Sequence, residues 1–189
     1  MPELAIFIGL QASGKSTYYR LHLSNTHVHV SKDRFRNNRR PARRQAELIT
    51  EALAAGRSVV VDNTNATVEL RRELIDLSRS HGATVTGYYF ASKLADCLTR
   101  NATRTGKDRV PDVGLFSVAK ALVRPSPDEG FDRLFHVTLV ARGTFAIEPW
   151  NDTTSPDGSD RRAAASHEPS PDSSEGTHEG RLRRPDEAV

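Results

Sequence analysis

The sequence has very little cysteine, and this scarcity excludes two kinds of site. Cys97 is the only cysteine among 189 residues, so the chain can form neither an intramolecular disulfide nor a cysteine-rich metal site. The residues around it, Leu94 to Leu98, predict a helix in which Cys97 is a packed, inert thiol. The function of this chain must therefore rest on other side chains.

Long apolar runs and a leader segment are missing as well. No run approaches the roughly 18 residues that a membrane span needs. A strand-like run already begins at Leu4, which leaves no room for a signal peptide. These absences predict a cytoplasmic protein that does not act in a membrane.

Aliphatic residues become rare after Trp150. Beyond this point Leu182 and Val189 are the only large ones, and the segment consists mainly of Ser, Pro, Asp, Glu, Gly and Arg. Such a composition buries too little apolar surface to offset the entropy lost on ordering. We therefore expect one folded domain over residues 1–150 and a disordered polar tail over 151–189.

Charge divides at the same boundary. The tail holds nine acidic and five basic residues, whereas residues 1–150 hold 22 basic and 15 acidic ones. A basic domain suits an anionic partner, such as nucleic acid or a phosphorylated small molecule. Arg outnumbers Lys by 22 to 5, a bias that a GC-rich genome also produces, so composition alone is a weak argument.

The most informative stretch is residues 9–16, GLQASGKS, which fits the phosphate-binding pattern G-x-x-x-x-G-K-[ST]. It follows the apolar run 4–8 and precedes a predicted helix over 16–23, as a P-loop requires. Lys15 would reach the β- and γ-phosphates of a nucleoside triphosphate, and the Ser16 hydroxyl would bind Mg²⁺. The residues expected to bind the nucleotide here are Gly9, Ala12, Ser13, Gly14, Lys15, Ser16 and Thr17.

Strand-like and helical patterns alternate along the first 140 residues. This alternation predicts βαβ units, and hence an α/β fold of the P-loop NTPase type: a parallel sheet of about five strands with helices on both faces. Ligands of such sheets bind beyond the carboxyl ends of the strands, so polar residues that directly follow a strand are site candidates. The expected strands are 4–8, 28–30, 58–61, 84–90 and 134–140, and the expected helices are 16–23, 42–55, 66–80, 93–103 and 112–122.

Two aspartates follow expected strands. Asp33 comes just after the run 28–30, with basic residues on both sides of it in the sequence. It could accept a proton or orient a substrate hydroxyl; the alternative is that it caps a helix. Asp62 ends the run Val59-Val60-Val61 and is expected to support Mg²⁺. Asn63 and Thr64 follow Asp62 at the same strand end, where they could bind a ligand. The alternative is that they form an ordinary loop of turn-forming residues.

Two arginines lie near the end of the fourth expected helix. Arg100 and Arg104 are four residues apart and would share one helical face. The Thr-Gly-Lys turn and Pro111 then break the helix. A mobile element with arginines opposite a phosphate loop would neutralise charge in a transition state, whereas the alternative is a solvated helix face.

Taken together, these segments resemble the kinase domain of phage and bacterial polynucleotide 5′-kinases, in the same order and at similar spacing over about residues 3–140. The D-x-x-R pair and the Asp-Asn-Thr-Asn element are more specific than the P-loop, which many functions share. The matching pieces are Gly9 to Thr17, Ser31 to Arg36, Val61 to Asn65, Arg100 to Arg104, and Val110 to Leu122.

The resemblance implies a role for each matching residue. Lys15 and Ser16 would hold ATP and Mg²⁺, and Arg104 would reach the donor phosphates from a lid, with Arg100 also among the nucleotide-binding residues. Asp62 would shape the metal and acceptor site.

On the acceptor side, the resemblance makes Asp33 the general base for a 5′-hydroxyl and Arg36 the residue that binds a phosphate of the acceptor strand. Asn63 and Thr64 are expected beside the substrate. Two features depart from the family: Arg34 stands where some relatives have an acidic residue, and residues 37–44 are unusually rich in arginine.

Three functions remain open at this point. The first is ATP-dependent phosphorylation of a 5′-hydroxyl end of DNA or RNA, which the arginine-rich segment favours. The second is a small-molecule kinase of the same fold that acts on a nucleoside, antibiotic or sugar. The third is a nucleotide-dependent switch, against which Asp33 argues because a switch needs no acceptor base. No phosphatase signature D-x-D-x-[TV] and no lysine-containing ligase signature is present, and the oligomeric state is left undetermined.

Overall fold

The structure, a computed structural model, describes residues 1–35, 37–141 and 143–151. Arg36 and most of the expected tail, residues 152–189, lie outside the described residues.

The domain is built on one six-stranded sheet with the strand order β2-β3-β1-β4-β5-β6. The first five strands run parallel, as predicted, and β6 pairs antiparallel with β5. β6 was not predicted, because a short edge strand that is mostly exposed and ends at a proline gives a weak sequence signal. The strands are β1 (Glu3–Ile8), β2 (His27–Val30), β3 (Ser58–Val61), β4 (Thr84–Ala91), β5 (Arg133–Ala141) and β6 (Thr144–Pro149).

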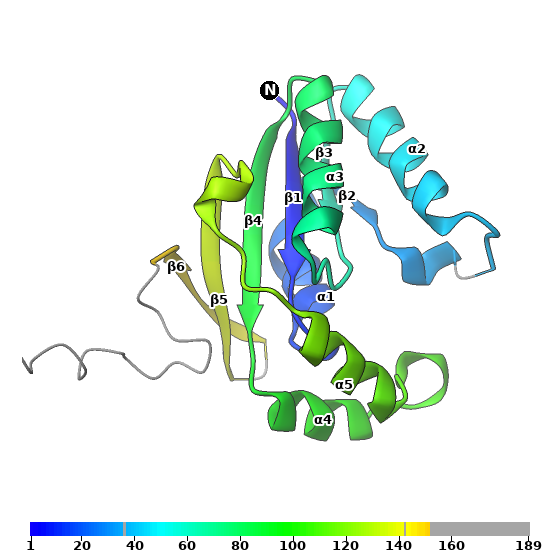
Figure 1. Cartoon of the computed structure of the whole chain (residues 1–189), viewed down its shortest axis with the longest axis vertical. Helices are drawn as coiled ribbons and strands as arrows, with labels where there is room; N and C mark the ends of the chain where they lie inside the picture. The colour runs from blue at the N-terminus through cyan, green and yellow to red at the C-terminus, as the bar shows by residue number, and fades with distance from the viewer. Residues whose placement is uncertain (36, 142, 152–189) are drawn as a thin grey trace, which may run out of the picture.

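Helices cover both faces of the sheet, as expected. α2 (Pro41–Ala54) and α3 (Val68–Ser80) lie on one face, and α1 (Lys15–Tyr18), which continues as a π-helical segment to Leu23, lies on the other (Figure 1). α4 (Leu94–Ala102) and α5 (Asp112–Ala121) sit beyond the carboxyl ends of the strands. In the described part of the chain, none of the helices has the length and apolarity to cross a membrane.

The core has one layer on each side of β1. Residues 4–8 of β1 are fully buried, which explains their unbroken apolar run. Leu4 and Ile6 pack toward Ile49 of α2 and Leu74 of α3. Phe7 faces the other side, where aromatic rings from α1 and β4 contact it and Phe145 of β6 packs against the same cluster.

A buried arginine fixes the loop that follows β3. Arg71 of α3 is fully buried and makes a two-pronged ion pair with Glu129, with both N···O distances at 2.6 Å. Its remaining nitrogen donates to the carbonyls of Asn65, Ala66 and Val123. Arg71 therefore ties the loop after β3 to the segment that follows α5.

The described chain ends on the sheet. The Trp150 N–H donates to the Leu134 carbonyl at 2.9 Å, and its ring contacts Tyr89. The Arg124 guanidinium lies 4.6 Å from the centre of the Trp150 ring. The residues up to Trp150 thus belong to the folded unit.

Candidate active site

Two glycines give the P-loop its shape. Gly9 has φ +143°, its N–H donates to the Thr64 carbonyl, and a Cβ there would lie 2.7 Å from the Phe90 carbonyl oxygen. Gly14 has φ +103° at the start of α1. Ala12 adopts φ +59°, a left-handed conformation that is uncommon for a residue with a side chain. The loop therefore leaves β1 and enters α1 by a path that larger residues at Gly9 and Gly14 would not allow.

The Lys15 side chain folds back onto the P-loop. Its Nζ donates to the carbonyls of Gly9, at 2.9 Å, and Leu10, and lies 3.4 Å from the Ser13 hydroxyl. Burial lowers the pKa of Lys15 to about 8, against the opposing effect of the Asp62 charge. The ammonium is thus a cation held at the phosphate-binding loop and poorly solvated.

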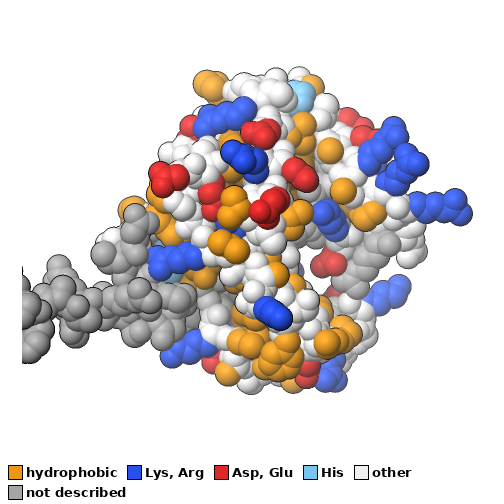
Figure 2. All heavy atoms as spheres, in the orientation of Figure 1, with side chains coloured by type: hydrophobic (Ala, Val, Ile, Leu, Met, Phe, Trp, Pro, Cys, Tyr) orange, Lys and Arg blue, Asp and Glu red, His pale blue; other side chains and the backbone are white. Residues whose placement is uncertain are grey.

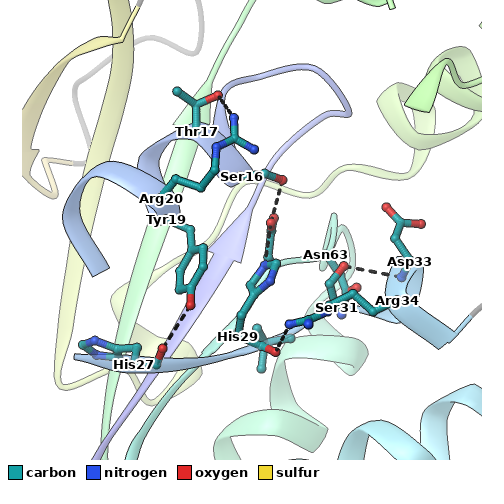
Figure 3. Close-up of polar contacts among 12 residues, drawn as sticks. Ser16, Thr17, Tyr19, Arg20, His27, His29, Ser31, Asp33, Arg34 and Asn63 are labelled. Carbon is teal, nitrogen blue, oxygen red and sulfur yellow. Dashed lines mark hydrogen bonds and ion pairs between the residues drawn. The ribbon is translucent and has the colours of Figure 1, made fainter. Parts of the chain in front are cut away.

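Asp62 joins the P-loop to β2. Its Oδ2 accepts hydrogen bonds from the Ser16 hydroxyl at 2.6 Å and from His29 Nε2 at 3.1 Å (Figure 3). The His29 ring is stacked on Tyr19, with ring centres 4.2 Å apart. Burial alone would raise the pKa of Asp62, but these two hydrogen bonds and the nearby Lys15 hold it below its usual value. Asp62 is therefore an ionised carboxylate next to the Ser16 hydroxyl.

A cavity of about 470 Å³ lies over the P-loop. Four segments surround it: the P-loop with the start of α1, the turn after β2, the loop after β3, and residues 103–110, which connect α4 to α5. The cavity brings together most of the predicted site residues, namely Ala12, Gly14, Lys15, Ser16, Thr17, Asp33, Asp62, Asn63, Thr64 and Arg104.

Gly9, Ser13 and Arg100 do not line this cavity. Arg100 Nε donates to the Ala12 carbonyl at 2.8 Å, so its side chain supports the back of the P-loop. The predicted shared helical face of Arg100 and Arg104 is wrong, because α4 ends at Ala102 and Arg104 belongs to the following loop.

Asp33 lies in a 3₁₀ turn, Lys32–Phe35, just past the end of β2. No α-helix begins there, since α2 starts at Pro41, so Asp33 is not a helix cap. Asn63 fixes the turn: its Oδ1 accepts from the Lys32 N–H at 2.9 Å and its Nδ2 donates to Gln45 at 2.7 Å. Asn63 thus holds the residue next to Asp33 in the turn.

Asp33 also lines a second, larger hollow of about 960 Å³, which shares Ser16, Asp62 and Asp108 with the first cavity. The second hollow runs past Arg34 and Phe35 toward the start of α2. Asp33 thus borders both spaces, at the place where a group in one would meet a group in the other.

Sequence reasoning missed several residues of this site. His29 contacts Asp62, and Gln45 of α2 holds Asn63. Asp108 borders both cavities. His29 could have been found from its position, because it precedes the end of β2 by one residue and its register partner Val60 lies close to Asp62.

The loop, the strand-end carboxylates and the sheet order with β1 between β3 and β4 define a P-loop nucleotide-binding domain with a kinase-like fold. The chain belongs to the AAA domain family, whose model matches residues 4–123.

The resemblance to polynucleotide kinases is confirmed by two relatives. The bifunctional polynucleotide phosphatase/kinase of Schizosaccharomyces pombe is 25% identical over 155 residues, and a protein of Acanthamoeba polyphaga mimivirus with a similar bifunctional description is 29% identical over 157 residues. The matches cover 79% and 78% of this chain but only 36% of each relative. The chain thus spans little more than a third of the length of these curated relatives.

Solved structures agree on the fold. A fungal RNA kinase aligns with a TM-score of 0.58 and 19% identity, over 73% of this chain and 38% of its own. Kti12 of Chaetomium thermophilum in complex with ADP-AlF3 aligns with a TM-score of 0.60 and 14% identity, over 72% of this chain and 89% of its own. A gluconokinase of Sinorhizobium meliloti aligns with a TM-score of 0.52 and 19% identity, over 74% of this chain and 84% of its own.

Proposed function

We propose that this domain, over residues 1–150, transfers the γ-phosphate of ATP to the 5′-hydroxyl end of DNA or RNA. The observation that carries the proposal is the position of Asp33 on the border shared by the P-loop cavity and the second hollow. A donor in the first space and an acceptor in the second would meet at this carboxylate. The two polynucleotide phosphatase/kinase relatives support the same acceptor class.

On the donor side, Lys15 neutralises the bridging phosphates, and Arg104 reaches them from the lid, defined here as residues 102–109. Arg100 acts behind the loop by holding the Ala12 carbonyl. The P-loop N–H groups and the start of α1 bind the remaining phosphate oxygens. A loose phosphoryl-transfer transition state needs this kind of positioning and charge neutralisation.

Mg²⁺ is the metal that this chemistry requires, and the residues present fit it. Ser16 and Asp62 offer a hydroxyl and an ionised carboxylate 2.6 Å apart, which are hard oxygen donors. No cluster of three metal-ligating side chains exists among the described residues, as suits a Mg²⁺ held partly by substrate phosphates. The bound ion would supply charge neutralisation at the β- and γ-phosphates.

On the acceptor side, Asp33 accepts the proton of the attacking hydroxyl, and Asn63 holds the turn that carries Asp33. Thr64 lines the P-loop cavity, which Asp33 also borders. Arg36, three residues beyond the base in sequence, binds the phosphate on the 3′ side of the attacked hydroxyl.

An arginine-rich hollow supports a polymeric acceptor. Asn38 lines both the second hollow and a smaller one of about 240 Å³ at the start of α2. Arg43 and Arg44 form ion pairs with Glu47, but within the described ranges no carboxylate pairs with Arg39 or Arg40. Figure 2 shows basic side chains gathered over this end of α2. Phosphates beyond the first nucleotide would meet this surface. It is lined by Arg39, Arg40, Arg43 and Arg44.

The decisive experiment compares acceptors by size. The protein is incubated with γ-labelled ATP and with 5′-hydroxyl oligonucleotides, nucleoside 3′-monophosphates, nucleosides and sugars. We expect a nucleoside to be roughly ten- to a hundredfold poorer than its 3′-monophosphate, because it lacks one charge-assisted contact. Arg36→Ala should remove most of this difference without changing ATP affinity, whereas Arg57→Ala, on the loop before β3, should not.

Efficient phosphorylation of free nucleosides or sugars would contradict the proposal. A small-molecule kinase would then take its place, and one observation favours that second candidate. The chain aligns with the gluconokinase over most of that enzyme's length, but with the polynucleotide relatives over only 36% of theirs.

A further inference from the structure

The lid, residues 102–109, is exposed along its whole length, yet it forms one wall of the site. Arg104 and Asp108 line the P-loop cavity, and Lys107 and Asp108 line the second hollow. In Figure 1 the lid joins the ends of α4 and α5. A segment with so little burial cannot depend on packing for its position, so its two ends must set where it lies.

Asn101 joins those two ends. It is fully buried, its Nδ2 donates to the Val110 carbonyl at 2.6 Å, and its Oδ1 accepts from the Val110 N–H at 3.1 Å. Each atom of the amide faces the complementary backbone group, which fixes the orientation of the side chain. Asn101 therefore holds the end of α4 next to Val110, which lies two residues before α5.

Few contacts inside the lid could replace this closure. The Arg104 N–H donates to the Asn101 carbonyl at 3.0 Å, and the Arg104 guanidinium lies 3.4 Å from the Asp108 carbonyl. The Thr103 hydroxyl donates to the Arg100 carbonyl at 2.8 Å, and the Asp108 N–H donates to the Thr105 carbonyl at 3.3 Å. The first of these contacts again leads to Asn101, and the Thr103 contact leads to the same helix. Asn101 and α4 are thus main supports for the position of Arg104 relative to the P-loop.

We propose that Asn101 is a positioning residue that closes the base of the lid and thereby holds Arg104 over the donor phosphates. This inference rests on the proposed function, because it assumes that Arg104 acts on those phosphates. Asn101 touches neither cavity itself. Its neighbour Arg100 supports the P-loop, so consecutive residues of α4 set the two opposite walls of one site.

A double-mutant cycle tests the proposal. Arg104→Ala should lower the rate of phosphate transfer from ATP about a hundredfold, by the usual magnitude for one lost cationic contact. Asn101→Ala should lower it about tenfold or more, because the loop closes less often. If Asn101 acts through Arg104, the double variant should be no slower than Arg104→Ala. Multiplication of the two effects would overturn the proposal. Thr99→Ala, an exposed position on the same helix, is the matched control and should leave the rate unchanged.

A second readout does not depend on turnover. Hydrogen exchange should become faster in the lid, residues 102–109, of Asn101→Ala and stay unchanged in β1 and β3; Val110 is left out of the comparison, because its N–H loses its own hydrogen-bond partner in this variant. Unchanged exchange in the lid of a folded variant would also overturn the proposal. If Asn101→Ala fails to fold, Asn101→Asp replaces it. The ionised aspartate still accepts from the Val110 N–H but presents an oxygen to the Val110 carbonyl and to Asp112, so the same loosening is expected when exchange is measured at a pH that keeps this carboxyl ionised.

The result of this test must not depend on the identity of the acceptor, so the double-mutant cycle is also measured on the hydrolysis of ATP in the absence of any acceptor. If the protein phosphorylates no 5′-hydroxyl end but the hydrolysis cycle is non-additive, the proposed function fails and the role of Asn101 stands. If oligonucleotides are phosphorylated and the cycle is multiplicative, the role of Asn101 fails and the proposed function stands.

Discussion

The two walls of the P-loop cavity are built differently. On the P-loop wall, Lys15 is 7% exposed and Asp62 is 6% exposed, and each makes at least two hydrogen bonds. On the opposite wall, Asp33 and Asp108 are exposed in short 3₁₀ turns, and Arg104 is exposed in the loop after α4. The sheet therefore pre-organises the nucleotide side, whereas local hydrogen bonds at their bases position the turns. Substitutions on the two walls should for this reason affect different steps.

The largest effect should come from Asp33→Asn on the exposed wall. Without a proton acceptor, we expect transfer to slow by about 10²- to 10⁴-fold, whereas ATP·Mg²⁺ should bind nearly as well as before. Single-turnover transfer and nucleotide titration separate the two quantities. Asp76→Asn, exposed on α3, is the control. An equal loss of nucleotide affinity would show that Asp33 belongs functionally to the P-loop wall.

Lys15→Ala should impair the function of the P-loop wall. Loss of this cation should cost roughly a hundredfold or more in rate, by the magnitudes usual for electrostatic stabilisation, and should weaken ATP binding as well. Lys120→Ala, exposed on α5, provides the comparison. Near-normal turnover of a folded Lys15→Ala protein would rule out the P-loop as the catalytic site.

The low pKa of Lys15 makes the difference between the walls visible without mutation. With its pKa near 8, Lys15 is charged at pH 7 and largely neutral at pH 9, so ATP affinity should fall about tenfold over this interval. Calorimetry at constant free Mg²⁺ measures this loss. Lys15→Arg should flatten the dependence, because arginine stays charged at both pH values. The same slope in both proteins would assign the titration to another group.

The smallest effect should come from the tail. A chain that ends after Asn151 should keep its melting temperature and activity, because the removed segment contributes little apolar surface. A chain that ends after Ala141 also loses β6, with Phe145 against Tyr18 and Trp150 against Tyr89, and should melt several degrees lower. A marked loss in the longer chain would show that the tail packs on the domain.

Much of the cavity could be predicted from the sequence. The P-loop pattern located Lys15 and Ser16, and the rule that ligands bind at strand ends selected Asp33 and Asp62. The five parallel strands were predicted from their apolar runs. These features are local, since a strand that is buried on both faces needs apolar residues at consecutive positions.

The position of Arg100 shows where such reasoning stops. Spacing alone gave it the same helical face as Arg104, but α4 ends between them and their side chains support opposite walls. The end of a helix is a weak sequence signal, because one turn more or less changes few local interactions.

The sequence by itself determined that this chain has a phosphate-binding loop on a parallel sheet with carboxylates at two strand ends. The tertiary structure alone decided which residues hold these groups in place. Arg100 meets Ala12 across 88 positions, and Arg71 meets Glu129 across 58. Local patterns specify secondary structure and burial because they depend on neighbouring residues, whereas such distant partners are selected only when the helices pack on the sheet.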